Sequence, residues 1–170
     1  INGAGGSAGT VAIQIAKSLG AEVTGVDNTE KLDLMRSIGA DHVVDYTQED
    51  FTRNGQHYDL ILDLKAYHAI LDYRRALSAR GIYLMVGGSV TLLFRLLFLG
   101  TLFPMIGSKK LRILGLKTNQ DLADLVELIE AGKVVPAIDK RYPLPEVAAA
   151  LHYLGDGHAK GNIVITVDHS

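Results

Sequence analysis

The chain has 170 residues, of which 48% are hydrophobic and 21% are charged, and its formal net charge is -2. This length suffices for one domain with a proper core and part of a second. Because positive and negative residues are interspersed, no basic field indicates a nucleic-acid partner. The absence of cysteine excludes a disulfide framework, a cysteine-ligated metal and a cysteine nucleophile within this sequence. It permits a reducing cytoplasm, which is the predicted location.

The beginning of the sequence and its most apolar segment bear on targeting. The first residue is not Met and stands directly before a glycine-rich stretch, so no secretory signal pattern is visible and we expect a fragment. The apolar segment "LLFRLLFLGTLFPMIG" (residues 92–107) is shorter than the ~20 residues that cross a bilayer, and it contains Arg95 and Pro104. We expect no membrane span, and a helix at an interface or lining a pocket there.

Helical patterns and short apolar runs alternate through most of the chain. In chain order they predict helices over residues 11–20, 31–39 and 73–81, and strands over 21–27, 40–46, 58–64 and 82–88. Each helix is expected to end at a glycine in the left-handed conformation, namely Gly20, Gly39 or Gly81. Apolar strands alternating with helices are typical of a parallel sheet covered on both faces, so we predict a doubly wound α/β fold.

The alternation of helices and strands continues to about residue 131 and changes after Gly132. A further strand is predicted over residues 111–117 and a helix over 119–131. After Gly132 a strand, a proline-marked turn, a helix over 145–154 and a closing strand over 163–167 are expected. This last part looks like a piece of another domain.

The opening "INGAGGSAGT" places a glycine turn before the first helix. Its best match to the G-x-G-x-x-G pattern has Ala4, Gly6 and Gly9 at the three fixed positions. The following helix presents its N-terminal amides to an anion. Asp27 comes about 20 residues later, where a carboxylate can accept hydrogen bonds from ribose hydroxyls, although it could instead cap the next helix. Together the turn, the helix and the acid predict a dinucleotide site.

The order of segments resembles the zinc-independent quinone oxidoreductase branch of the medium-chain dehydrogenase/reductase superfamily. No tyrosine has a lysine four residues later, which disfavours short-chain dehydrogenases. The resemblance covers nearly the whole chain and includes the stretches "NGAGGSAGTVAIQIAKSLGAEVTGV", "EKLDLMRSIGADHVVDYTQEDF", "YRRALSARGIYLMVGG" and "LIEAGKVVPAIDKRYPLPEVAAALHYLGDGHAKGNIVITV".

This resemblance implies a Rossmann domain over residues 1–131 with a truncated first strand. Residues 132–170 would be the returning part of a split GroES-like substrate domain, whose first half would precede the chain. The implied activity is metal-free hydride transfer from NAD(P)H to a quinone, enone or related carbonyl compound, and we expect the fragment alone to be inactive. A homodimer formed through the edge strand at 111–117 is also expected.

The motif and the resemblance together imply a set of cofactor contacts. They are Ala4, Gly5, Gly6, Ser7, Ala8, Asp27, Lys31, Tyr46, Leu64, Val86, Gly87, Gly88 and Asn162. Lys31 and Tyr46 match family positions that contact a 2′-phosphate, which favours NADP(H), although Lys31 could instead be a solvated helix charge. Asp27 would repel that phosphate, so NAD(H) is possible.

In two places the sequence departs from the family pattern. The family usually has a lysine at the position of Asn162 and small residues at that of Lys65. No catalytic group is identified and no metal ligand is predicted, because the histidines lack ligand spacing; His68 is the one histidine considered as a substrate contact. Two other functions stay open: a catalytically silent dinucleotide sensor, and a zinc alcohol dehydrogenase whose metal ligands lie outside this sequence.

Overall fold

The computed structural model describes residues 1–86, 108–114 and 122–167, and its main feature is a parallel sheet. The strands are β1 (Thr24–Asp27), β2 (His42–Asp45), β3 (Tyr58–Asp63), β4 (Leu77–Met85) and β5 (Lys110–Ile113). β1 pairs with β2, and β4 lies between β3 and β5, with every pairing parallel. The predicted strand over 111–117 therefore begins one residue earlier, and its last three positions lie outside the described residues.

The first two residues join these two groups of strands. Asn2 forms parallel bridges with Val26 of β1 and Asp63 of β3. The Val26 amide donates to the Ile1 carbonyl over 2.9 Å, and the Asn2 amide donates to the Leu62 carbonyl over 2.9 Å. The resulting order is β2, β1, residues 1–2, β3, β4 and β5. The chain that follows Asn2 thus leaves the sheet between β1 and β3, at their carboxyl ends.

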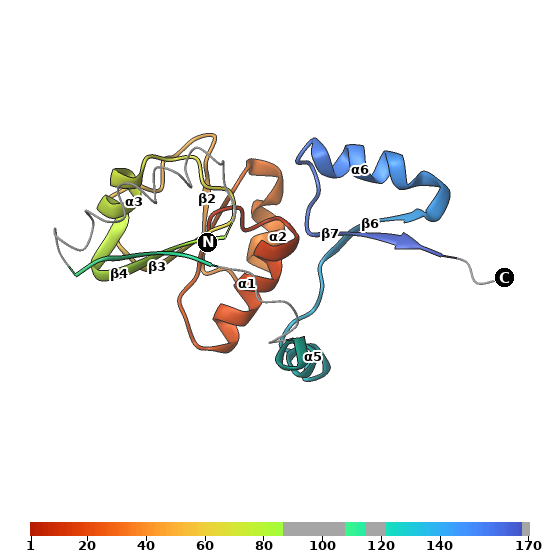
Figure 1. Cartoon of the computed structure of the whole chain (residues 1–170), viewed down its shortest axis with the longest axis horizontal. Coiled ribbons are helices and arrows are strands. Elements are labelled where there is room, and N and C mark those ends of the chain that lie inside the picture. The colour runs from red at the N-terminus through yellow and green to blue at the C-terminus, as the bar shows by residue number, and fades with distance from the viewer. Residues whose placement is uncertain (87–107, 115–121, 168–170) are drawn as a thin grey trace.

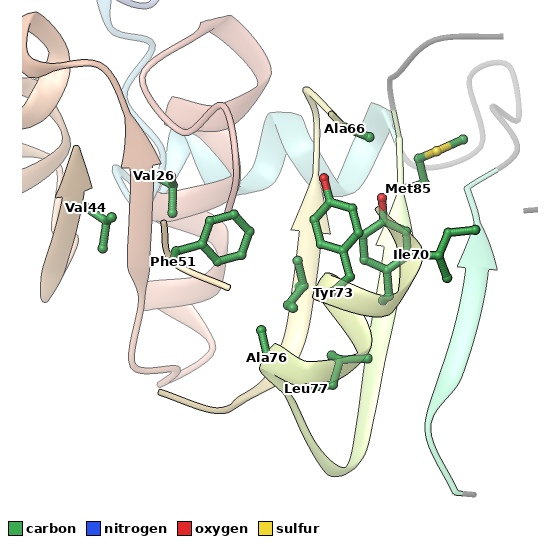
Figure 2. Packing of buried hydrophobic residues seen from close by; sticks show 11 residues of the cluster. Val26, Val44, Phe51, Ala66, Ile70, Tyr73, Ala76, Leu77 and Met85 are labelled. Carbon is green, nitrogen blue, oxygen red and sulfur yellow. The ribbon is translucent and has the colours of Figure 1, made fainter. Parts of the chain in front are cut away.

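Helices cover both faces of this sheet. They include α1 (Ser7–Ser18), α2 (Leu32–Ser37), which follows the short 3-10 helix η1 (Thr29–Lys31), and α3 (Ile70–Ala76). Ile13 of α1 and Met35 of α2 share one core with Val23, whereas Tyr73 of α3 belongs to a second core that contains Val26. Figure 2 shows this second core, with Tyr73 and Ile70 packed between α3 and the strands. The predicted doubly wound α/β fold is confirmed.

Glycine ends two of the three helices as predicted. Gly20 and Gly39 have positive φ values of 79° and 106°. The third helix is a correction, because it ends at Ala76 and the chain is already extended at the fully buried Leu77. Gly81 lies within β4 without a left-handed φ, and a Cβ there would lie 2.8 Å from the Tyr58 carbonyl oxygen. Close approach of β3, rather than a helix cap, requires this glycine.

The last part of the chain contains a second, two-stranded sheet. α5 (Leu122–Glu130) precedes β6 (Ile138–Pro143), the 3-10 helix η3 (Leu144–Glu146), α6 (Val147–Gly155) and β7 (Asn162–Thr166). β6 and β7 pair in parallel. In Figure 1 this pair and α6 lie on the side of α1 and α2, away from β3 and β4. The division into residues 1–131 and 132–170 stays a prediction.

Residues 87–107 lie outside the described part of the chain. The predictions for Gly87, Gly88 and the apolar segment at 92–107 therefore also fall outside it. Among the helices within the described ranges, none has the length and apolar character needed to cross a membrane.

Candidate dinucleotide site

A tight turn connects residues 1–2, which lie between β1 and β3 in the sheet, to α1. The amides of Gly3 and Ala4 both donate to the Val26 carbonyl, over 3.0 and 3.1 Å, and Gly3 has a φ of 80°. A Cβ on Gly9 would lie 2.3 Å from the Gly3 carbonyl oxygen, so the first turn of α1 packs directly on this bend. α1 has no side-chain cap and no acidic residue in its first turn. Its N-terminal amides and the positive end of its dipole are therefore left for an anion.

A cleft of about 230 Å³ lies over this turn. It is lined by Gly3, Gly6, Ser7, Ala8, Gly9, Asp27, Lys31, Leu64, Lys65, Leu154, Gly157, Ala159 and Gly161. Six of the predicted cofactor contacts meet here, namely Gly6, Ser7, Ala8, Asp27, Lys31 and Leu64. The other residues of the lining come from the turn and the start of α1, from the loop after β3, from the last turn of α6 and from the segment between α6 and β7.

The segment before β7 closes one side of this cleft. The Gly161 amide donates to the Gly5 carbonyl over 3.0 Å, and the Ser7 hydroxyl hydrogen-bonds to Oδ1 of Asn162. Nδ2 of Asn162 donates to the Ala137 carbonyl over 3.0 Å. Oδ1 of Asn162 thus holds the C-terminal segment against the glycine turn, and its Nδ2 ties β7 to the residue before β6.

Asp27 and Lys31 form a buried ion pair beside the turn. They are 6% and 5% exposed, and Nζ of Lys31 lies 3.5 Å from Oδ1 of Asp27. Oδ2 of Asp27 accepts the Gly5 amide and Oδ1 accepts the Asn28 amide, each over 2.9 Å. The Lys31 stem packs against Gly5, where an added Cβ would lie 2.6 Å from the Lys31 Cβ. Lys31 is therefore not a solvated helix charge, and Asp27 positions the turn as well as facing the cleft.

A second cavity of about 200 Å³ adjoins the first. It is lined by Asn2, Gly3, Asp27, Tyr46, Lys65 and Tyr67. The rings of Tyr46 and Tyr67 meet edge to face with their centroids 6.2 Å apart. Burial, reinforced by the nearby carboxylates of Asp50 and Asp63, raises the pKa of Tyr67 to about 12, so this hydroxyl is neutral at physiological pH. Aromatic surfaces beside a carboxylate suit an adenosine group.

A buried hydrogen-bond network fixes the loop that borders both cavities. Asp63, at the end of β3, is fully buried; its Oδ1 accepts from Nδ2 of Asn2 over 2.8 Å, and its Oδ2 accepts from the Tyr83 hydroxyl over 2.8 Å. The Tyr73 hydroxyl accepts the amides of Tyr67 and His68, each over 3.2 Å. Burial raises the pKa of both Tyr73 and Tyr83 above the ordinary range. The sequence signal for this network is an acid that ends an apolar run, "YDLILD".

His68 packs inside the protein. Its ring lies 4.1 Å from the Tyr67 ring and 5.4 Å from the Phe51 ring, measured between centroids. Its Nε2 is 3.7 Å from Oδ1 of Asp50. The ring lines neither of the two cavities described above.

Three further predicted contacts, Ala4, Gly5 and Val86, line neither cavity. Ala4 is fully buried in the core with Ile13, and Gly5 is covered by Lys31. Val86 continues β4, where its amide donates to the Asp63 carbonyl over 2.9 Å. Two lining residues that were not predicted from the sequence, Gly157 and Gly161, stand in the glycine-containing stretch "GDGHAKG", which is their signal in the sequence, and both have a positive φ in the structure.

Within the part of the chain that the structure describes, no group of three or more His, Cys, Asp or Glu residues is arranged to hold a metal ion. The described residues therefore provide no set of side chains that could ligate zinc.

A parallel sheet with helices on both faces, and a glycine turn at the point where the strand order reverses, defines a Rossmann-type nucleotide-binding domain. A family model described as zinc-binding dehydrogenase matches residues 38–165. The chain belongs to this family, and thereby to the medium-chain dehydrogenase/reductase superfamily.

Individual relatives agree with this assignment. An NADPH-dependent alkenal/one oxidoreductase, chloroplastic, from Arabidopsis thaliana is 34% identical over 169 residues, which cover 97% of this chain and 39% of the relative. An NAD-dependent alcohol dehydrogenase from Saccharolobus solfataricus is 34% identical over 177 residues, covering 96% of this chain and 48% of the relative. The chain thus spans less than half the length of these relatives.

Among solved structures, the quinone oxidoreductase from Coxiella burnetii superposes with a TM-score of 0.83 at 22% identity. The match covers 98% of this chain and 51% of that structure, and at this identity it supports the fold alone.

Proposed function

We propose that the protein containing this chain is an NAD(P)H-dependent oxidoreductase that transfers hydride to a quinone, an enone or a related carbonyl compound without zinc. The observation that carries the proposal is the cleft at the N-terminus of α1, where the glycine turn leaves room for a pyrophosphate. Two of the relatives, the NADPH-dependent alkenal/one oxidoreductase and the NAD-dependent alcohol dehydrogenase, support nicotinamide chemistry.

When bound, the nicotinamide ring supplies the hydride. The part of this chain is to bind and orient the cofactor. The amides of Ser7 and Ala8, next to Gly6, would donate hydrogen bonds to the pyrophosphate, and the positive end of the α1 dipole would stabilise its charge. The loop after β3, held by the buried Asp63, borders the nicotinamide half, to which Leu64 and Val86 are the predicted contacts. The Gly161 segment, whose amide donates to the Gly5 carbonyl, would border the pyrophosphate on one side.

NADP(H) is the proposed cofactor and NAD(H) the alternative. Tyr46, which is 45% exposed, lines the second cavity beside Asp27, and Lys31 supplies a positive charge next to the same carboxylate. A 2′-phosphate would share Lys31 with Asp27, so the choice of cofactor depends on this ion pair.

The larger organisation is proposed on the same basis. Residues 1–131 form the cofactor domain and 132–170 return to a substrate domain, as the small β6–β7 unit with α6 suggests. β5 is the last strand of the described sheet and carries the exposed Ile113, which suits pairing with a second copy in a homodimer. The cytoplasmic location stays a prediction, and the name of one relative refers to the chloroplast.

The test is a fluorescence titration of the complete protein with NADPH and NADH in parallel, repeated on Lys31→Ala and Asp27→Ala. We expect tighter binding of NADPH, a preference that Lys31→Ala removes. A preference for NADH that is lost in Asp27→Ala would assign the adenosine site to the carboxylate and NAD(H) as the cofactor. If neither nucleotide binds, the proposed function is wrong.

Turnover measurements separate the remaining alternatives. Reduction of a quinone or an enone by the complete protein is expected, with no stoichiometric zinc by metal analysis. Nucleotide binding without turnover of any such acceptor would favour a silent sensor. A stoichiometric zinc required for activity would contradict the zinc-free proposal.

A further inference from the structure

We propose that Lys65 is a further cofactor-binding residue, whose ammonium group binds the pyrophosphate bridge from the side of the cleft opposite α1. This inference rests on the proposed function, because it needs a dinucleotide in the cleft. It assigns to this chain a positive charge that does not come from the glycine motif.

The main chain of Lys65 is held firmly. Its amide donates to Oδ1 of Asp63 over 3.2 Å, and its carbonyl accepts from Nδ2 of Asn2 over 3.2 Å. Both partners are buried, and Asp63 is further fixed by the Tyr83 hydroxyl. The loop therefore presents the Lys65 side chain from a fixed position at the carboxyl end of β3.

The Lys65 side chain crosses the cleft. Its Cβ lies 3.5 Å from where a Cβ on Gly3 would stand, at the bottom of the glycine turn. Its Nζ lies 3.7 Å from where a Cβ on Gly157 would stand, in the loop after α6. Lys65 also lines both cavities. The ammonium group consequently stands between the glycine turn and the C-terminal segment, where a group bound by the turn would lie.

The charges of the cleft favour an anion beside Lys65. Asp27, Lys31 and Lys65 are the charged residues in its lining, and the first two are paired with each other. In the described ranges, Nζ of Lys65 forms no ion pair and no hydrogen bond, and the residue is exposed. One positive charge thus remains unbalanced, opposite the positive end of the α1 dipole. A doubly charged diphosphate between them would satisfy both.

The direction of the side chain favours the pyrophosphate over a 2′-phosphate. A 2′-phosphate belongs to the ribose next to Asp27 and Tyr46, in the second cavity. Nζ of Lys65 instead extends toward Gly157, which lines the first cavity together with Gly6 and Ser7. NADH and NADPH share the pyrophosphate, whereas only NADPH has the 2′-phosphate. A comparison of the two nucleotides therefore distinguishes a pyrophosphate contact of Lys65 from a 2′-phosphate contact.

The experiment uses the complete protein and measures the affinity of NADH and NADPH by fluorescence titration. Lys65→Met keeps the length of the side chain and removes its charge. We expect it to weaken both nucleotides by about tenfold, because a charge-assisted hydrogen bond is lost. Lys65→Arg should retain most of the affinity. Lys133→Met is the matched control, since Lys133 is exposed and lines neither cavity.

The outcomes are distinct. Equal weakening of both nucleotides in Lys65→Met, with a weaker dependence on salt and rescue by Lys65→Arg, supports the proposal. Weakening confined to NADPH would overturn it in favour of a 2′-phosphate contact. Unchanged or tighter binding would overturn it as well, and would leave the cofactor site itself intact. A wild-type protein that binds neither nucleotide would overturn the proposed function and this inference together.

Discussion

Tyr83→Phe is the sharpest test of the buried network that holds the loop after β3. The Tyr83 side chain is 1% exposed, and its hydroxyl donates over 2.8 Å to Asp63, which is 0% exposed. A hydrogen bond to a buried charged group contributes about 1.5–3 kcal/mol, so we expect the unfolding free energy to fall by about 2 kcal/mol. For a unit of roughly 150–250 residues, that loss lowers the melting temperature by roughly 4–8 °C, and for the longer complete protein by less.

The assay is urea and thermal unfolding of the complete protein, with Tyr142→Phe as control. Tyr142 lies in β6, half-buried, and its hydroxyl has no hydrogen bond to any residue in the described ranges, so its loss should change stability by less than about 0.5 kcal/mol. Burial raises the pKa of Tyr83, so the hydroxyl stays protonated. The difference in unfolding free energy between wild type and Tyr83→Phe should therefore be constant between about pH 6 and 9. Equal stability of wild type and Tyr83→Phe would refute the role given to this network.

Three further predictions address the turn, the contact between the two parts of the chain, and acid stability. Gly9→Ala should abolish nucleotide binding and lower the melting temperature, because its Cβ would meet the Gly3 carbonyl at 2.3 Å; Gly155→Ala, with open space around it, should do neither. Gln14→Ala should cost about 1–2 kcal/mol in urea unfolding, since its amide donates to the Val135 carbonyl over 3.0 Å and accepts the Val135 amide over 2.8 Å. The hydrogen bond from the Lys17 side chain lowers the pKa of Asp41, so the stability that this carboxylate contributes is present at neutral pH and is lost as the pH falls through the lowered pKa. Asp41→Asn should therefore reduce the fall of the unfolding free energy below about pH 4. An unchanged fall of the unfolding free energy in the variant would contradict this.

Local patterns in the sequence suffice for the architecture. Apolar runs that alternate with helical periods predict a parallel sheet covered on both faces, and Gly20 and Gly39 end their helices with positive φ as expected. These features depend on backbone preferences and on burial within one element. The predicted end of the third helix was wrong. The helical pattern of "YRRALSARG" is interrupted at Leu77, because this residue is buried in the core as the first residue of β4.

The glycine turn and Asp27 could also be selected from the sequence, since the motif specifies their spacing along the chain. Whether the carboxylate of Asp27 is buried and paired with a positive charge could not be predicted in this way. The sequence places Asp27 and Lys31 four residues apart, but only the packing of Lys31 against Gly5 makes the pair buried. Lys65 and Gly157 are far apart along the chain, and their approach depends on how the C-terminal segment folds back over the turn.

The sequence by itself therefore determined the fold class and the position of the glycine turn, because both are encoded in local periodicity and motif spacing, and its resemblance to known dehydrogenases indicated the family. Only the tertiary structure decided which charges are neutralised and which remain available, because electrostatic partners are set by distances across the sheet and between segments. Lys31 is paired with Asp27, whereas Lys65, which also lines the cleft, has no ion pair among the residues that the structure describes.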